Sequence, residues 1–138
     1  MKLGNQVVSL ELAKKLKELG VKQESCFQWL KITDGGIPQS GGFLSLWVND
    51  RRYFVNELFN KTSFFKIEQQ IDITEEFSAF TVAELGEMLP PNSKTSKWLD
   101  TNWWAENERL LNNNAIPADT EADARAKMLI YLLENKLL

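Results

Sequence analysis

The stretch that decides the fold is residues 118–138, "ADTEADARAKMLIYLLENKLL". Thr120 stands at an N-cap position, and Asp123 completes an acidic form of the capping box. Glu121 and Arg125 are spaced to pair along one turn. The apolar residues after the cap lie within about 100° of one another on a helix. They are Ala122, Ala126, Leu129, Ile130, Leu133 and Leu137. We therefore predict a helix over 120–136.

This helix has a second apolar side, made of Met128, Tyr131 and Leu132. A helix exposed to water on its whole back would carry polar residues there. We therefore expect a second element to cover this side, either a helix over 9–19 or another copy of the chain. The final leucines, Leu137 and Leu138, are expected to be packed.

Two further helices are predicted upstream. Ser9 is placed to cap a helix over 9–19, in which apolar residues recur at helical spacing. A helix over 81–89 is indicated by Thr81 and Glu84, which have capping-box spacing. Pro90 and Pro91 end that helix. Its interior Gly86 costs about 1 kcal/mol relative to Ala, and close approach of a neighbouring backbone would explain it.

Strands are predicted between the first two helices. The segments "CFQWLKI" (26–32), "FLSLWV" (43–48) and "RRYFV" (51–55) are rich in strand-forming residues. Asn49 and Asp50 fit a tight hairpin between the last two. A short strand is predicted over 63–67.

The remaining segments are harder to place. The glycine-rich stretch 34–42 is expected to be a flexible loop, and the acidic "DITEE" (72–76) a solvated one. A strand is predicted around 102–111, and 112–119 is expected to be a turn-rich connection.

Together these elements predict one α+β domain over residues 1–138. It would contain an antiparallel sheet of three to five strands and about three helices. Helices on both faces of the sheet would give an α-β-α sandwich.

Composition excludes several classes of function. The net charge of −3 gives no general attraction to nucleic acid. A local basic patch would be needed, and its candidates Lys14, Lys15, Lys17 and Lys22 are interleaved with glutamates, which favours a solvated helix face. The first fifteen residues hold no apolar run of signal-peptide length, and no apolar run is long enough to span a membrane. With a lone Cys26, this favours a reducing cytoplasm.

The chain contains no histidine, which removes Ser-His-Asp and Cys-His catalysis and zinc sites built on His. Cys26 is expected to be buried and inert. Asp72, Glu75 and Glu76 would supply paired carboxylates only if they were buried together. We predict no catalytic residue, metal site or cofactor.

Three segments resemble a known group of proteins. They are "SLELAKKLKELGVKQES" (9–25), "FTVAELGEMLP" (80–90) and "ADTEADARAKMLIYLLEN" (118–135). They resemble a family of small uncharacterised proteins from bacteriophages, prophages and mobile elements. The arrangement is also similar to the phage ABA-sandwich domain. The resemblance implies a helix–sheet–helix fold and a bacterial host cell, and carries over no catalytic residue.

Tryptophans are the candidate binding residues. Trp98, Trp103, Trp104 and Trp47 are many for a chain of this size. Trp103 and Trp104 face opposite sides of a strand, so only one can meet a one-sided core. The other is expected to meet a second layer, a partner or a ligand.

These observations favour a non-enzymatic interaction module that binds a macromolecular partner, either another protein or a second copy. The alternative is a small carboxylate- or metal-dependent hydrolase or nucleic-acid-processing enzyme. Nucleic-acid binding through the lysines near 14–22 is a third reading.

Overall fold

The computed structural model describes residues 2–58, 61–67, 70–98, 102–110 and 115–138. Mixed helices and antiparallel strands confirm the α+β class. The elements are η1 (Leu3–Asn5), α1 (Leu10–Glu18), β1 (Phe27–Asp34), β2 (Ile37–Pro38), β3 (Phe43–Val48), β4 (Arg51–Leu58), β5 (Lys61–Lys66), β6 (Ile71–Ser78), α2 (Val82–Met88), β7 (Lys94–Trp98), β8 (Asn102–Glu106), β9 (Ile116–Ala118) and α3 (Glu121–Glu134).

The larger sheet contains β1 to β6. Its order is β2-β1-β3-β4-β5, and β6 pairs with the other side of β1. Trp29 on β1 is therefore opposite both Leu44 of β3 and Phe77 of β6. Asn49 and Asp50 have positive φ angles of 49° and 64°, as the mirror-image turns of tight hairpins require. The predicted β3–β4 hairpin is confirmed.

The smaller sheet has the order β7-β8-β9. The predicted strand 102–111 is present but ends at Glu106. The expected turn-rich connection 112–119 includes β9, which pairs Ile116 and Ala118 with β8. The prediction of one sheet with three to five strands is therefore wrong, because the described strands form two sheets of six and three.

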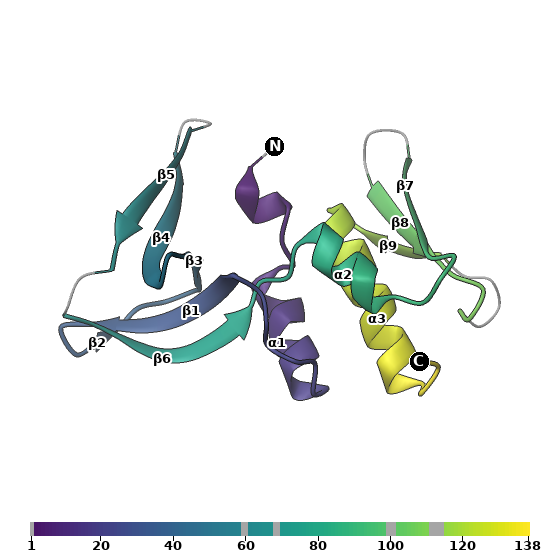
Figure 1. The fold of residues 1–138 in the computed structure, drawn as a ribbon, viewed down its shortest axis with the longest axis horizontal. Helices are drawn as coiled ribbons and strands as arrows, with labels where there is room; N and C mark the ends of the chain where they lie inside the picture. Colours follow the sequence, from purple (N-terminus) through teal and green to yellow (C-terminus); the bar gives the residue numbers. More distant parts are fainter. Residues whose placement is uncertain (1, 59–60, 68–69, 99–101, 111–114) are drawn as a thin grey trace.

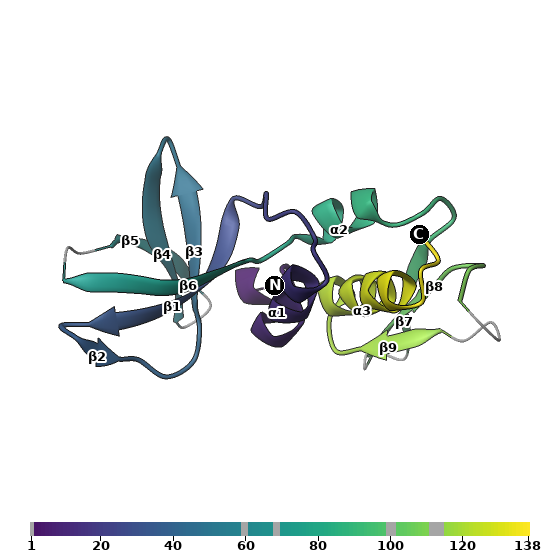
Figure 2. The same ribbon diagram turned by 90° about the horizontal axis from the view of Figure 1, so that it is seen from below.

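The layering also differs from the expected sandwich. Figures 1 and 2 show the two sheets at opposite ends of the molecule, with α1 and α3 between them. α1 contacts β6 and α3, and α3 contacts α2 and all three strands of the smaller sheet. The helices thus lie between two sheets, so the α-β-α arrangement is not the one adopted.

One apolar cluster passes through these layers. It includes Leu16 of α1, Phe77 of β6, Leu85 of α2, Leu132 of α3 and Ala105 of β8, all of them buried. The prediction that both apolar sides of the last helix are sheltered is confirmed for Met128, Leu129, Ile130 and Leu132. Leu137 is partly buried, but the prediction is wrong for Leu138, whose exposed fraction is 52%.

Local capping signals explain where α2 and α3 begin. The Thr81 hydroxyl accepts from the Glu84 N–H, and the Glu84 carboxylate accepts from the Thr81 N–H. This confirms the predicted capping box. Thr120 caps α3 as predicted by accepting from the Asp123 N–H.

The Asp123 side chain does not complete a capping box. Its Oδ1 accepts from the backbone N–H of Ser9 at 2.7 Å, which joins residues 114 positions apart. Ser9 stands at the N-cap of α1 without a capping bond from its own side chain. Burial raises the pKa of the Asp123 carboxyl above its usual value, and the bond from Ser9 opposes this shift.

Two segments expected to be loops contain strands. The acidic stretch "DITEE" lies within β6, which pairs along β1. A bulge there leaves Thr74 without a residue directly opposite it on β1, because Ile73 pairs with Ile32 and Glu75 with Lys31. The bulge interrupts the alternation of side chains and hides the strand pattern. The glycine-rich stretch includes β2, which follows a turn at Gly35 and Gly36, both with positive φ.

Gly86 faces a side chain instead of the expected backbone. A methyl group at this position would collide with the guanidinium of Arg125. Arg125 donates from Nη1 to the carbonyl of Val82, which joins α3 to α2.

Candidate functional site

Exposed apolar side chains gather on the larger sheet. Among the described side chains, the large apolar residues with substantial exposure are Ile37, Phe43, Trp47, Val48, Phe64, Phe65 and Leu138. All except Leu138 belong to β2, β3 or β5. Scattered single apolar residues are ordinary on a protein surface, but a group on the strands of one sheet indicates a binding surface.

Four aromatic residues share one face of the β3–β5 meander. Phe43 and Trp47 alternate with buried Leu44, and Phe54 is paired with Phe65 across β4 and β5. The rings of Phe43 and Phe54 lie 6.0 Å apart. We call Phe43, Trp47, Phe54 and Phe65 the aromatic face.

The opposite side of the same strands is covered near Leu44 and Val55, but not at Val48 and Phe64, which are exposed. Leu44 and Val55 lie there and pack in a cluster with Val7 and Ala79. The aromatic face therefore points away from the segment that covers the sheet.

Trp47 is held in place by charged neighbours. The guanidinium of Arg52 lies 4.4 Å from the centre of the Trp47 ring. Arg52 also donates two parallel bonds to Glu76, of 3.2 Å and 3.0 Å. Such a bidentate pair fixes the guanidinium in one plane. The exposed ring of Trp47 thus rests on a support that is already ordered.

The other tryptophans proposed as binding residues lie elsewhere. Trp103 packs against the main apolar cluster from β8. Trp104 is partly buried and pairs with Pro117 of β9. The side chain of Trp98 lies outside the described residues. Trp47 does not come together with Trp103 or Trp104, because they belong to different sheets.

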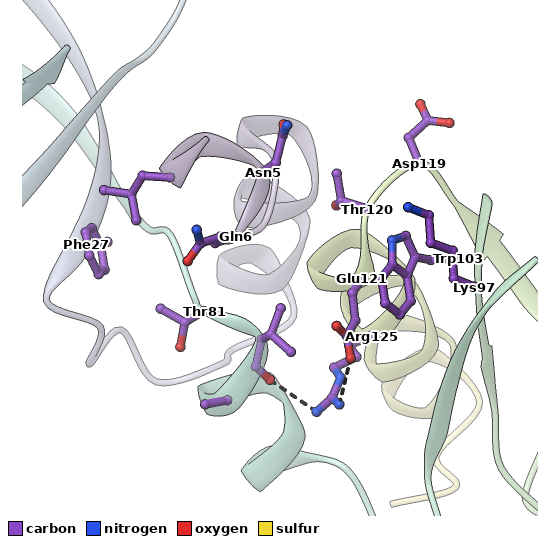
Figure 3. Close-up of a pocket in the computed structure, with 13 residues that line it drawn as sticks. Asn5, Gln6, Phe27, Thr81, Lys97, Trp103, Asp119, Thr120, Glu121 and Arg125 are labelled. Carbon is purple, nitrogen blue, oxygen red and sulfur yellow. Dashed lines mark hydrogen bonds and ion pairs between the residues drawn. The ribbon is translucent and has the colours of Figure 1, made fainter. Parts of the chain in front are cut away.

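A groove opens where the N-terminal segment, α2, α3 and the smaller sheet meet (Figure 3). Its volume is about 770 Å³. Trp103 forms part of its wall, with charged groups around it: Lys97, Asp119, Glu121 and Arg125. Two acids and two bases leave the groove without a net charge preference.

Two of the four charged groups of this groove, Arg125 and Glu121, are engaged with each other. Arg125 donates to Glu121 at 3.1 Å and to the Val82 carbonyl at 3.2 Å. Thr95 donates to Glu121 at 2.7 Å. These bonds connect β7, α2 and α3, so Arg125 stabilises the junction of three elements.

The acidic residues considered for catalysis are spread along β6. Glu76 is paired with Arg52, and Asp72 lies opposite Thr33 near the far end of β1. Glu75 is exposed. Within the described ranges, no three His, Cys, Asp or Glu side chains come close enough to hold a metal ion.

The lysines near the first helix have structural contacts. Lys14 and Lys17 lie 5.7 Å and 5.1 Å from the ring centre of Phe77. Lys17 also donates to the Glu76 carbonyl, and Lys22 pairs with Glu24.

Cys26 is exposed, so the expectation that it is buried is wrong. It stands just before β1, outside the alternation that buries Leu30.

The aromatic face includes three residues that sequence reasoning did not select: Phe43, Phe54 and Phe65. A signal for Phe65 was available in "SFFK" (63–66). Adjacent phenylalanines on a strand point to opposite faces, so they cannot both enter a one-sided core.

No protein-family model matches this chain, and neither a curated protein nor a solved structure matches it. The candidate site therefore depends on the geometry alone. Within the part of the chain that the structure describes, no helix is both long enough and apolar enough to cross a bilayer.

Proposed function

We propose that this chain is a non-enzymatic interaction module that binds a protein partner through the aromatic face. The single observation that carries the proposal is that exposed Phe43 and Trp47 of β3 share one face of the β3–β5 meander with exposed Phe65 of β5. Their exposed fractions are 37%, 42% and 54%. The helices bury large apolar side chains such as Leu16, Leu85 and Leu132, whereas these three rings of the larger sheet stay exposed.

The chemistry of these residues suits protein recognition. An aromatic side chain buries roughly 150–250 Å² when it is covered, and aromatic residues are enriched among those that dominate binding energy. A ring that is ordered before binding loses less conformational entropy on association. The contact between Trp47 and Arg52 supplies that order.

The proposal keeps the setting that the sequence suggested. A phage- or mobile-element-derived module would act in the cytoplasm of a bacterial host, where Cys26 stays reduced. A second copy of the chain is the other candidate for the partner. Sedimentation at increasing protein concentration distinguishes the two, because only self-association depends on the concentration of this chain.

The test is affinity capture from a bacterial lysate with four matched baits. We expect the wild-type chain to retain a partner, and Trp47→Ala and Phe65→Ser to lose it. Leu138→Ser is the control, because Leu138 is equally exposed but lies outside the aromatic face. Equal capture by all four baits contradicts the proposal.

A further inference from the structure

Strand β5 forms an open edge of the larger sheet. It is the last strand in the order β2-β1-β3-β4-β5, and its described pairing is with β4 alone. All six of its residues, Lys61 to Lys66, are exposed. Figure 1 shows β5 on the far side of β4 from β3, away from the helices. Alternate residues of an edge strand direct N–H and C=O groups outward without a partner.

The sequence of this edge limits what can pair with it. β5 reads "KTSFFK", with a lysine at each end and two phenylalanines inside. A second β5 strand beside this edge would bring another Lys61 and Lys66 next to the first pair, and neither strand holds an acidic residue to neutralise them. Like charges brought close together repel each other and destabilise such a pairing. A second copy of the chain is therefore a poor occupant of this edge.

The lysines have no acidic partner within the described part of the chain. No ion pair there includes Lys61 or Lys66. The nearest acid across the ladder is Glu57, opposite Thr62, and both of its carboxylate oxygens accept from the N–H of Gly4. The edge thus presents two positive charges that are open to a new neighbour.

We propose that β5 binds an extended segment of a partner protein by strand addition, and that this segment carries an acidic residue at each end and apolar residues between them. This deepens the proposed function and depends on it. In the antiparallel arrangement, the acids lie opposite Lys66 and Lys61, and two apolar residues lie opposite Phe65 and Phe64. The main-chain bonds give affinity, and the charges select the partner.

The aromatic face continues onto this edge. Phe65 belongs to it and lies opposite Phe54, whereas Phe64 lies opposite Val55 on the other side of the strand. An added strand therefore covers one phenylalanine on each of its faces. This accounts for the two adjacent aromatic residues on a strand that has no helix over it.

The test uses two end-blocked synthetic hexapeptides, Glu-Val-Val-Thr-Thr-Glu and Lys-Val-Val-Thr-Thr-Lys. Each is titrated into the isotopically labelled full chain while backbone amide shifts are followed by NMR. We expect the acidic peptide to shift the β5 amides and to bind at least about fivefold more tightly than the basic one, from two exposed ion pairs. High salt should reduce this preference.

Two controls separate strand addition from general charge attraction. The double variant Lys61→Glu with Lys66→Glu should reverse the preference and bind the basic peptide more tightly. An acidic peptide methylated at alternate backbone nitrogens should lose binding, since it lacks the donors of the ladder. Equal binding of both peptides, shifts confined to another surface, or no shift of β5 overturns the proposal. A wild-type dimer formed through β5 also overturns it.

Failure here is distinguishable from failure of the proposed function. If the charge-reversed variant still captures the lysate partner while Trp47→Ala does not, strand addition is wrong and the aromatic face remains the binding surface. If Trp47→Ala captures the partner as well, the proposed function is wrong.

Discussion

In the smaller sheet, Ala105 and Ala118 are buried beneath α3, whereas in the larger sheet Trp47 and Phe65 face solvent. Small residues on the smaller sheet let α3 approach it closely, and Leu129 and Leu132 of α3 then fill the remaining space. Within the described residues, α1 packs on the larger sheet mainly at β6. The comparison indicates that the half of the molecule with the smaller sheet and α3 stabilises the fold. The half with the larger sheet presents an exposed surface for binding.

The largest expected effect tests the stabilising half. Leu132 on α3 is fully buried, so Leu132→Ala should lower the free energy of unfolding by about 2–5 kcal/mol. Chemical denaturation measures the change. Leu133→Ala is the control, since Leu133 is only partly buried and should cost less. Equal losses for both variants would refute the proposed packing of α3.

The second prediction concerns the junction at Arg125. Arg125→Ala removes the bond to the Val82 carbonyl and the pair with Glu121, and should cost about 1–3 kcal/mol. Gly86→Ala should destabilise the wild type, because the new methyl group displaces the guanidinium. In the Arg125→Ala background, the same change should stabilise α2 by up to about 1 kcal/mol. A double-mutant cycle measures this coupling, and additive effects would show that the two positions do not interact.

The third prediction concerns Asp123. Asp123→Ala should cost about 1–2 kcal/mol, because the N–H of Ser9 loses its acceptor. Burial raises the pKa of Asp123 in the folded state, so the folded chain holds that proton more tightly than the unfolded chain. Its contribution to stability is therefore present at low pH and is lost as pH rises from the unfolded pKa, about 3.9, through the higher folded value.

Asp123→Asn should remove this part of the pH dependence while keeping an acceptor for Ser9. Denaturation curves between acidic and neutral pH measure it. Glu134→Gln is the control, because Glu134 is an exposed acid at the other end of α3. An unchanged slope in Asp123→Asn would contradict the assignment.

The smallest expected effect tests the exposed surface of the larger sheet. Trp47→Ala and Phe65→Ser should change stability by no more than about 0.5 kcal/mol, as is usual for exposed positions. Thermal unfolding measures this. Losses comparable to that of Leu132→Ala would mean that the aromatic face is part of the core and that the contrast between the two sheets is false.

The helices were predictable because their signals are local. The capping pair Thr81 and Glu84 and the apolar period of α3 lie within a few residues of the backbone that they specify. The strands of the larger sheet were predictable where side chains alternate, as in β3 and β4. The bulge at Thr74 interrupts that alternation, so the sequence pattern of residues 72–76 indicates a loop where β6 lies.

Pairing between distant segments was not predictable. The number of sheets depends on partners such as Trp29 with Phe77, which no local pattern encodes. The candidate site was found only in part for the same reason. Trp47 stands out by residue type, but its support by Arg52 and its grouping with Phe65 follow from the order of the strands.

The bond between Ser9 and Asp123 has a consequence for synthesis on the ribosome. The chain emerges from its amino terminus, and domains made in this order begin to fold before they are complete. The start of α1 gains its carboxylate acceptor only after Asp123, 114 residues further along the chain, has been translated. The strands of the larger sheet are therefore exposed to the cell, aromatic residues included, before the last helix closes the centre of the molecule.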